Sequence, residues 1–366
     1  MFNSIYKDKK VLITGNTGFK GSWLTTWLLK LGANVYGISK DIPTMPSMFN
    51  ELGLKNNITH YKNDVRDLDS VVQIINEVKP DFVFHLAAQA LVSVSYSDPV
   101  ETMTTNVIGT TNILEALKQS KHDCVGIFIT SDKCYNNVEW EWGYKETDAL
   151  GGKDVYSGSK GAAELVFKSY FHSFFNKDES NVKVVTTRAG NVVGGGDWAK
   201  DRIVPDCMRA WSKNEIVEIR SPNATRPWQH VLEPLSGYLA LGKQLYDDKK
   251  LNGESFNFGP TAQHSHTVED ILRDMCKYWN IKDSSKAYQI TDNIKFHEAG
   301  LLKLNCDKAL FHLKWLPTLS YEQLMEFTGT WYYNFYKGQE NMFDFTLKQI
   351  EKYVNIASKK GINWTK

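Results

Sequence analysis

The stretch KVLITGNTGFKG, residues 10–21, joins an apolar strand pattern to a glycine-rich turn with GxxGxxG spacing. Glycines let the backbone bend tightly and approach a diphosphate at a helix N-terminus, where free N–H groups point outward. Such turns also occur without a ligand, so the motif gains weight from its place at the start of an alternating series. We expect it to bind a dinucleotide, with candidate contacts from Gly15, Thr17, Gly18, Phe19, Lys20 and Gly21.

Short apolar runs and helical patterns alternate through the first half of the chain. The predicted strands are 10–14, 34–39, 57–64, 81–88, 125–130 and 182–188, and the predicted helices are 19–31, 67–78, 98–118 and 154–175. This order predicts βαβ units, and therefore an α/β fold with a Rossmann-like, doubly wound parallel sheet.

Beyond about residue 190 the alternation stops. Turn-rich stretches at 194–198, 221–227 and 257–260 separate helical patterns near 233–247, 267–279 and 320–337. We expect residues 1–190 to bind the dinucleotide and carry the catalytic residues. We expect residues 191–366 to form a smaller, partly interleaved α/β substrate-binding domain.

Composition excludes several classes of protein. The 366 residues include 43 basic and 42 acidic side chains, with no basic block that would indicate nucleic-acid binding. No run of about 18 apolar residues predicts a membrane span, and no signal-peptide pattern precedes the first strand. Five scattered cysteines without a CxxC pair argue against a disulfide framework and a zinc site. We expect a cytoplasmic protein that needs no metal.

The residues at the end of the second predicted strand are those that usually distinguish NAD from NADP. Residues 38–40 read Ile-Ser-Lys where an acid that binds the ribose is usual, and Asp41 is the nearest carboxylate. Because a basic residue such as Lys40 can accommodate a 2′-phosphate, both NAD and NADP stay open at this point. Asp64 and Val65 are candidates for the adenine edge, although Asp64 would serve equally well as a helix N-cap or turn residue.

Two sets of polar residues are expected to lie close together at the carboxyl ends of the strands. ITSDKCYNN, residues 129–137, places Ser131, Asp132 and Lys133 directly after a buried strand. In VYSGSK, Tyr156 and Lys160 share one helix face at i, i+4 spacing. A tyrosine, with a usual pKa of about 10, becomes a useful base when positive charge stabilises its phenolate. A capped turn and an exposed Tyr–Lys pair are the ordinary alternatives, but the order of the motifs favours catalysis.

These motifs resemble a known family. GNTGFKG (15–21), HLAAQ (85–89), SDK (131–133) and YSGSK (156–160) resemble an extended short-chain dehydrogenase/reductase. SDKCY, RAGNVVGGGDWAKDRIVPD (188–206) and RPWQHVLEPLSGY (226–238) are similar to the CDP-glucose branch of the nucleotide-sugar 4,6-dehydratases. The resemblance covers nearly the whole chain. It implies a homo-oligomeric lyase, dimer or tetramer, that uses bound NAD on CDP-glucose in deoxysugar biosynthesis, such as that of lipopolysaccharide O-antigen.

The resemblance also implies a division of catalytic work. Tyr156, supported by Lys160, takes the proton of the 4-hydroxyl while hydride leaves C4 for NAD. Ser131 polarises the new keto oxygen, and Asp132 protonates the departing 6-hydroxyl. Lys133 stands where many relatives carry a glutamate that removes the C5 proton. It is either that base, with a lowered pKa, or a group that orients Asp132.

Further contacts follow from motif positions. The resemblance places Leu86, Ala87, Ala88 and the structural Asn106 beside the cofactor, and its candidates on the substrate side are Gln89, Asn191, Trp198, Arg202, Arg226 and His230. For Trp198, core packing is the commoner fate. Two alternatives stay open: a dehydratase or epimerase acting on a GDP-, dTDP- or UDP-sugar, and a non-catalytic NAD-sensing protein. A simple epimerase does not need Asp132 and Lys133, and a sensor would not need Tyr156.

Overall fold

Seven parallel strands form the centre of the fold in this computed structural model, which describes residues 1–177, 179–219, 221–261, 266–291 and 301–366. Their order is β3–β2–β1–β4–β5–β6–β11, and every neighbouring pair is parallel. The strands are β1 Lys10–Thr14, β2 Asn34–Ser39, β3 Thr59–Lys62, β4 Phe82–His85, β5 Cys124–Ile129, β6 Val182–Ala189 and β11 Ser255–Phe258. The Rossmann-like sheet predicted from the alternation is confirmed.

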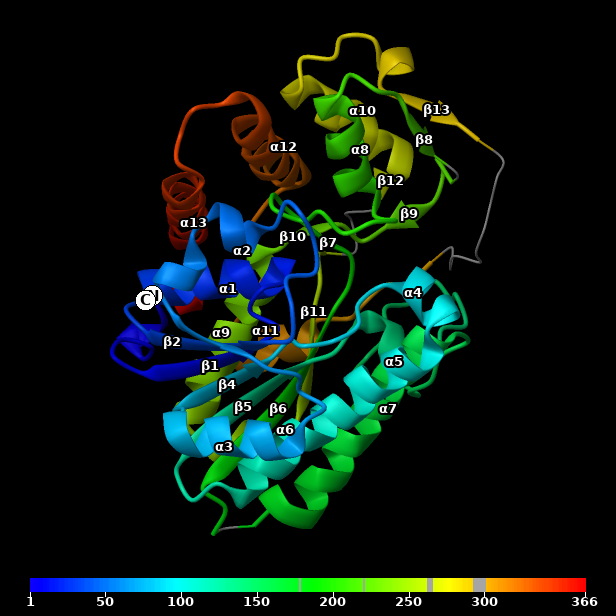
Figure 1. Ribbon diagram of the computed structural model, residues 1–366. Coiled ribbons are helices and arrows are strands. Elements are labelled where there is room, and N and C mark those ends of the chain that lie inside the picture. Colours follow the sequence, from blue (N-terminus) through cyan, green and yellow to red (C-terminus); the bar gives the residue numbers. More distant parts are fainter. Residues whose placement is uncertain (178, 220, 262–265, 292–300) are drawn as a thin grey trace.

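Helices cover both faces of this sheet (Figure 1). Side chains alternate along each strand, so that in β1 Leu12 joins one apolar core while Val11 and Ile13 join the other. Leu12 packs with α3 Leu68–Val78, α6 Gly109–Gln119 and α7 Val155–Tyr170. The opposite face packs with α1 Phe19–Lys30, α9 Leu232–Asp247 and α13 Met342–Lys359. Both faces are therefore buried, as parallel sheets require.

A smaller part of the chain lies beyond the carboxyl ends of the strands (Figure 1). It contains α8 Ile203–Ser212, α10 Val268–Tyr278 and α12 Tyr321–Lys337, with the short strand pairs β7 Val192–Val193 with β10 Gln229–His230, β8 Val217–Ile219 with β13 Tyr288–Ile290, and β9 Thr225–Arg226 with β12 His266–Thr267. The N- and C-termini lie side by side, away from this smaller part of the chain (Figure 1), and the Asn3 N–H donates to the Lys366 carbonyl at 2.9 Å. None of the helices in the described ranges is long and apolar enough to cross a membrane.

Several predicted boundaries were wrong. The strand predicted at 81–88 ends at His85, and residues 86–91 form a loop. The helix predicted at 98–118 is three pieces, α5 Pro99–Met103, the π-helical η3 Thr104–Ile108 and α6, and α7 likewise ends in the π-helical η5 Phe171–Phe175. The stretch 257–260 is not wholly a loop, because Asn257 and Phe258 complete the edge strand β11. The boundary at residue 190 stays a prediction. Beyond that residue, β11 is a strand of the main sheet and α9 packs against one of its faces.

Candidate active site

The glycine-rich turn between β1 and α1 accepts no side chains at its two tightest points. Gly15 adopts a φ of +76°, and a Cβ there would lie 2.8 Å from the Ala87 nitrogen. A Cβ on Gly21 would lie 2.1 Å from the Gly15 carbonyl oxygen. Among the described residues, no side chain caps the N-terminus of α1 at Gly18, and no acid occupies its first turn. The positive helix end and its amides therefore fit the diphosphate of a dinucleotide.

Thr17 and Lys20 connect this turn to the rest of the site. The Thr17 N–H donates to the Ser39 hydroxyl at 3.3 Å, and its own hydroxyl donates to the Asp41 carbonyl at 2.7 Å, which fixes the turn against the end of β2. Burial, together with the positive charge of Arg202, lowers the pKa of Lys20 to about 8. Phe19, in contrast to Thr17 and Lys20, packs against the large apolar core.

Asp64 pairs with Arg66 on the same loop. Both carboxylate oxygens accept hydrogen bonds from the Arg66 guanidinium, the shortest at 2.6 Å, and this pairing holds the pKa of Asp64 below its usual value. The N-cap of α3 is Asp67 and not Asp64. Val65 is buried, and its carbonyl accepts from the Asn112 amide at 3.0 Å. This edge of the site is thus a fixed polar loop.

The loop after β4, which contains Leu86, Ala87 and Ala88, is held by Asn106. The Asn106 side chain accepts from the Gln89 N–H at 2.9 Å and donates to the Gln89 carbonyl at 3.1 Å and to the Ser159 hydroxyl at 2.8 Å. It therefore ties the loop to α7. The Gln89 side-chain amide bonds to Leu91 in its own loop and donates to the Thr102 hydroxyl on α5, so these contacts occupy it.

The end of β5 forms a short capped turn. Ser131 caps the one-turn helix η4 Asp132–Cys134 by accepting from the Lys133 N–H at 3.3 Å. The Ser131 hydroxyl donates to the Asp132 carboxylate at 2.9 Å. Asp132 is only 5% exposed, and its burial raises the pKa of the carboxyl group against the opposing charge of Lys133. A raised pKa keeps a proton on the carboxyl group closer to neutral pH, as a general acid requires.

Tyr156 and Lys160 occupy the first turns of α7, which starts at the N-cap Asp154. Both side chains are buried, and the Lys160 Nζ lies 5.9 Å from the centre of the Tyr156 ring. Burial raises the pKa of Tyr156 to about 12, even though Ser131 and the charge of Arg202 act to lower it. Burial also lowers the pKa of Lys160 to about 8. Desolvation thus outweighs the expected help of the ammonium, and the side chains alone do not make Tyr156 a ready base.

One pocket joins the β5 turn to the later half of the chain. It has about 250 Å³ of open space and is lined by Asp132, Lys133, Asn191, Arg226, Pro227 and Leu302. Four of the predicted site residues, from three separate stretches of sequence, therefore meet there. A carboxyl group, an ammonium and a guanidinium around one cavity suit a polar, anionic ligand.

The other substrate-side candidates lie apart from this pocket. Arg202 pairs with Asp197 at 2.7 Å, and the negative charge of Asp197 raises the pKa of Arg202. The Trp198 ring packs with aromatic residues of α12 and is 3% exposed. His230 is fully buried between Trp23 and Phe327. Burial lowers the pKa of His230 to about 3, so it stays neutral. Trp198 and His230 therefore pack in the core, and their place on the substrate side stays a prediction.

The fold and the site invite comparison with known proteins. A sequence model described as GDP-mannose 4,6 dehydratase matches residues 12–328 of this chain.

The chain belongs to this family.

Two curated relatives show how far the similarity to nucleotide-sugar dehydratases extends. The CDP-glucose 4,6-dehydratase of Salmonella typhimurium (strain LT2) is 42% identical over 359 residues, covering 97% of this chain and 99% of the relative. The dTDP-D-glucose 4,6-dehydratase of Dictyostelium discoideum is 27% identical over 89% of this chain and 82% of its own. A crystal structure of a dTDP-glucose 4,6-dehydratase from Streptomyces venezuelae with NAD bound shares the fold, with a TM-score of 0.75 and 19% identity over 90% and 98% of the two chains.

Sequence reasoning missed a buried ion pair behind the active site of this dehydratase. The Arg188 guanidinium pairs with both oxygens of Glu164 at 2.9 Å, and neither side chain is exposed. Glu164 also accepts from Thr130, one residue before Ser131. The pair therefore connects β6, α7 and the end of β5. Glu164 lies four residues after Lys160 on α7, a spacing that could have drawn attention to it.

Proposed function

We propose that this protein is a CDP-glucose 4,6-dehydratase, which converts CDP-D-glucose to CDP-4-dehydro-6-deoxy-D-glucose and water. The observation that carries the proposal is the convergence of the buried Asp132 and Ser131, at the end of β5, with Tyr156 and Lys160 on α7. The relative from Salmonella typhimurium, similar over almost the full length of both chains, supports the choice of reaction and of nucleotide.

The first half-reaction is assigned to α7. Tyr156 accepts the proton of the 4-hydroxyl, and the neighbouring Ser131, which lowers the pKa of Tyr156, polarises the oxygen from which that proton leaves. Lys160 supplies positive charge on the same helix face. A bound NAD would supply the acceptor for the C4 hydride and the donor that restores it at C6. The uncapped amino end of α1 and the cramped Gly15 and Gly21 fit the diphosphate of this cofactor.

The elimination is assigned to the β5 turn. Asp132 protonates the departing 6-hydroxyl, because burial raises the pKa of its carboxyl group. The hydrogen bond from Ser131 holds this carboxyl group in place and offsets part of the rise in pKa. Lys133 lines the same pocket as Asp132, together with Asn191 and Arg226. It either removes the C5 proton or orients Asp132. Asn191 and Arg226 contact the nucleotide diphosphate, for which the planar guanidinium is well shaped.

A panel of four substrates tests the proposal. The purified protein with NAD is given CDP-, dTDP-, GDP- and UDP-glucose, and the 4-keto-6-deoxy product is measured by chromatography and mass. We expect product from CDP-glucose at a rate at least tenfold above the other three, without net accumulation of NADH. A preference for another nucleotide would overturn the choice of CDP, and absence of any dehydrated product would overturn the reaction.

The assembly is part of the proposal. Exposed apolar side chains lie on neighbouring helical elements α5, η3, α7 and η5, namely Val100, Met103, Ile108, Leu165 and Phe174. We assign these helices to the contact between two copies in a homo-oligomer. Leu165→Asp is expected to lower the mass measured by light scattering to that of a smaller assembly. An unchanged mass would contradict this assignment.

We also assign the enzyme to the cytoplasm. All five cysteines are free thiols, and four of them are buried. Free thiols suit a reducing compartment.

A further inference from the structure

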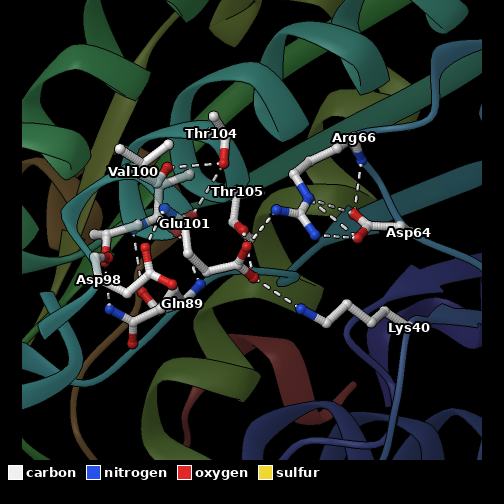
Figure 2. A network of polar contacts seen from close by, with 11 residues as sticks. Lys40, Asp64, Arg66, Gln89, Asp98, Val100, Glu101, Thr104 and Thr105 are labelled. Carbon is white, nitrogen blue, oxygen red and sulfur yellow. Dashed lines mark hydrogen bonds and ion pairs between the residues drawn. The ribbon is translucent and has the colours of Figure 1, made fainter.

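Four charged side chains form a continuous series of ion pairs, here called the network, at one edge of the site (Figure 2). The Lys40 Nζ lies 2.8 Å from Glu101 Oε1, and Arg66 Nη1 pairs with Glu101 Oε2. Arg66 also pairs with Asp64 at 2.6 Å. The network therefore contains two cations and two carboxylates, and Glu101 is the member that connects Lys40 to Arg66.

The network stands where the adenosine ribose binds in Rossmann-like folds. Lys40 directly follows β2, and the residues on either side of it hold the glycine-rich turn through Thr17. In such folds an acid at this position takes the ribose 2′-hydroxyl, whereas a basic residue accommodates a 2′-phosphate. By this rule Lys40, with Arg66 on the adjoining loop, would favour a phosphorylated ribose.

Glu101, which lies on a different element, argues against a preference for a 2′-phosphate. It belongs to α5, whose N-cap Asp98 accepts from the Glu101 N–H at 2.9 Å and so fixes the start of the helix. The hydrogen bond from Lys40 lowers the pKa of Glu101, and the same bond raises the pKa of Lys40. Both groups are therefore charged at neutral pH, and each stabilises the other. A phosphate approaching Lys40 would meet this carboxylate.

We propose that Glu101 selects a dinucleotide without a 2′-phosphate, by pairing with Lys40 and Arg66 and by repelling a second anion beside them. The inference deepens the proposed function, because it concerns the ribose end of the same cofactor site. It assigns to a helix that follows β4 the discrimination that an acid at the end of β2 usually provides.

Binding measurements on the full-length protein test this role. Dissociation constants for NAD⁺ and NADP⁺ are measured by isothermal titration calorimetry on nucleotide-free wild type and on Glu101→Gln. We expect the variant to bind NADP⁺ about tenfold more tightly than wild type, because one negative charge a few ångströms from the phosphate is removed. Affinity for NAD⁺ should change by less than about threefold. The gain should shrink at high salt.

Three further variants sharpen the test. Glu101→Asp keeps the charge and should keep NADP⁺ binding weak. Glu115→Gln, on α6, removes an equal charge from a carboxylate that pairs with Lys118, and should leave NADP⁺ affinity unchanged. Adding Lys40→Ala to Glu101→Gln should abolish most of the gain.

The outcomes separate this inference from the proposed function. If wild type binds NAD⁺ but Glu101→Gln gains no NADP⁺ affinity, the inference is wrong and the proposed function stands. An equal gain in Glu115→Gln would also overturn it, since the effect would then be one of net charge. If wild type binds neither nucleotide, the cofactor assignment in the proposed function fails.

Discussion

Burial acts on Asp132 and Tyr156 in the same direction, with opposite consequences. Taking either group out of water disfavours its charged form, so the pKa of Asp132 rises and that of Tyr156 rises to about 12. The shift helps Asp132, which has to deliver a proton. It hinders Tyr156, which has to accept one, and Ser131 and Arg202 offset only part of that cost. The residues thus divide into a prepared acid and a base that depends on further positive charge.

This division predicts separate losses for two variants. Tyr156→Phe should abolish hydride transfer, because no group then takes the 4-hydroxyl proton. Asp132→Asn should permit oxidation at C4 but slow the loss of water by about 10²–10⁴-fold, because an amide does not protonate the leaving hydroxyl. Rapid-mixing absorbance should therefore detect reduced cofactor in Asp132→Asn only. Asp123→Asn, an exposed acid at the other end of β5, is the control and should behave as wild type. Equal loss of both steps in Asp132→Asn would contradict the assignment.

Lys133→Ala distinguishes the two roles of this lysine. If Lys133 removes the C5 proton, the variant should oxidise C4 normally but exchange the C5 proton with solvent deuterium at least tenfold more slowly. Mass spectrometry of recovered substrate and product measures that exchange. Exchange at the wild-type rate with failed elimination would instead assign Lys133 to holding Asp132.

At the scale of elements, the Glu164–Arg188 pair holds α7 to the sheet. Arg188 extends from β6 to Glu164 on α7, and its guanidinium also donates to the Tyr135 hydroxyl at 2.7 Å. Glu164 accepts further bonds from Thr130 and Thr186. Because Thr130 precedes Ser131, and Glu164 follows Lys160 by one helical turn, the pair fixes the two catalytic elements relative to each other.

Removing one partner should therefore be costly. Arg188→Ala leaves a buried carboxylate without its cation, and we expect a loss of about 3–5 kcal/mol in the free energy of unfolding measured in urea. Lys277→Ala breaks the exposed pair with Asp274 on α10 and should cost less than about 1 kcal/mol. Similar losses of unfolding free energy in the two variants would mean that the buried pair does not hold α7 to the sheet.

At the scale of the whole molecule, Glu233 joins α9 to the C-terminal part of the chain. Its carboxylate accepts from the backbone N–H groups of Thr318 and Leu319 and from the Tyr353 hydroxyl on α13. The side chain is buried, and burial raises its pKa from an ordinary 4.5 to about 7. These bonds hold a segment more than 80 residues away in sequence against α9.

The raised pKa makes stability depend on pH. Between the ordinary value and about 7, the folded state holds a proton that the unfolded state has released, so stability falls as pH rises through this window. The contribution of Glu233 is at most about 3 kcal/mol and is lost above about pH 7. Urea unfolding at several pH values should show this slope in wild type and a flatter one in Glu233→Gln. Identical slopes would show that other groups control the pH dependence.

Local pattern was sufficient for much of the fold and part of the site. Alternating runs predicted six strands of the main sheet, because a buried strand between helices has a characteristic length and polarity. The glycine spacing predicted the turn after β1, and the spacing of Tyr156 and Lys160 put them on one helix face. These features depend on neighbouring residues. The edge strand β11 was missed because its four residues end in a turn-like Gly-Pro.

Tertiary structure alone decided which distant residues meet. Glu101 reaches Lys40 across 61 positions, and Arg188 pairs with Glu164 across 24. The pocket brings Asp132 together with Asn191 and Arg226 only because strand order places β5 beside β6 and returns the later chain over their ends. The same packing buries the Trp198 and His230 side chains in the core. Sequence determines what each segment can form, whereas burial and charge pairing between segments determine which side chains remain available to a ligand.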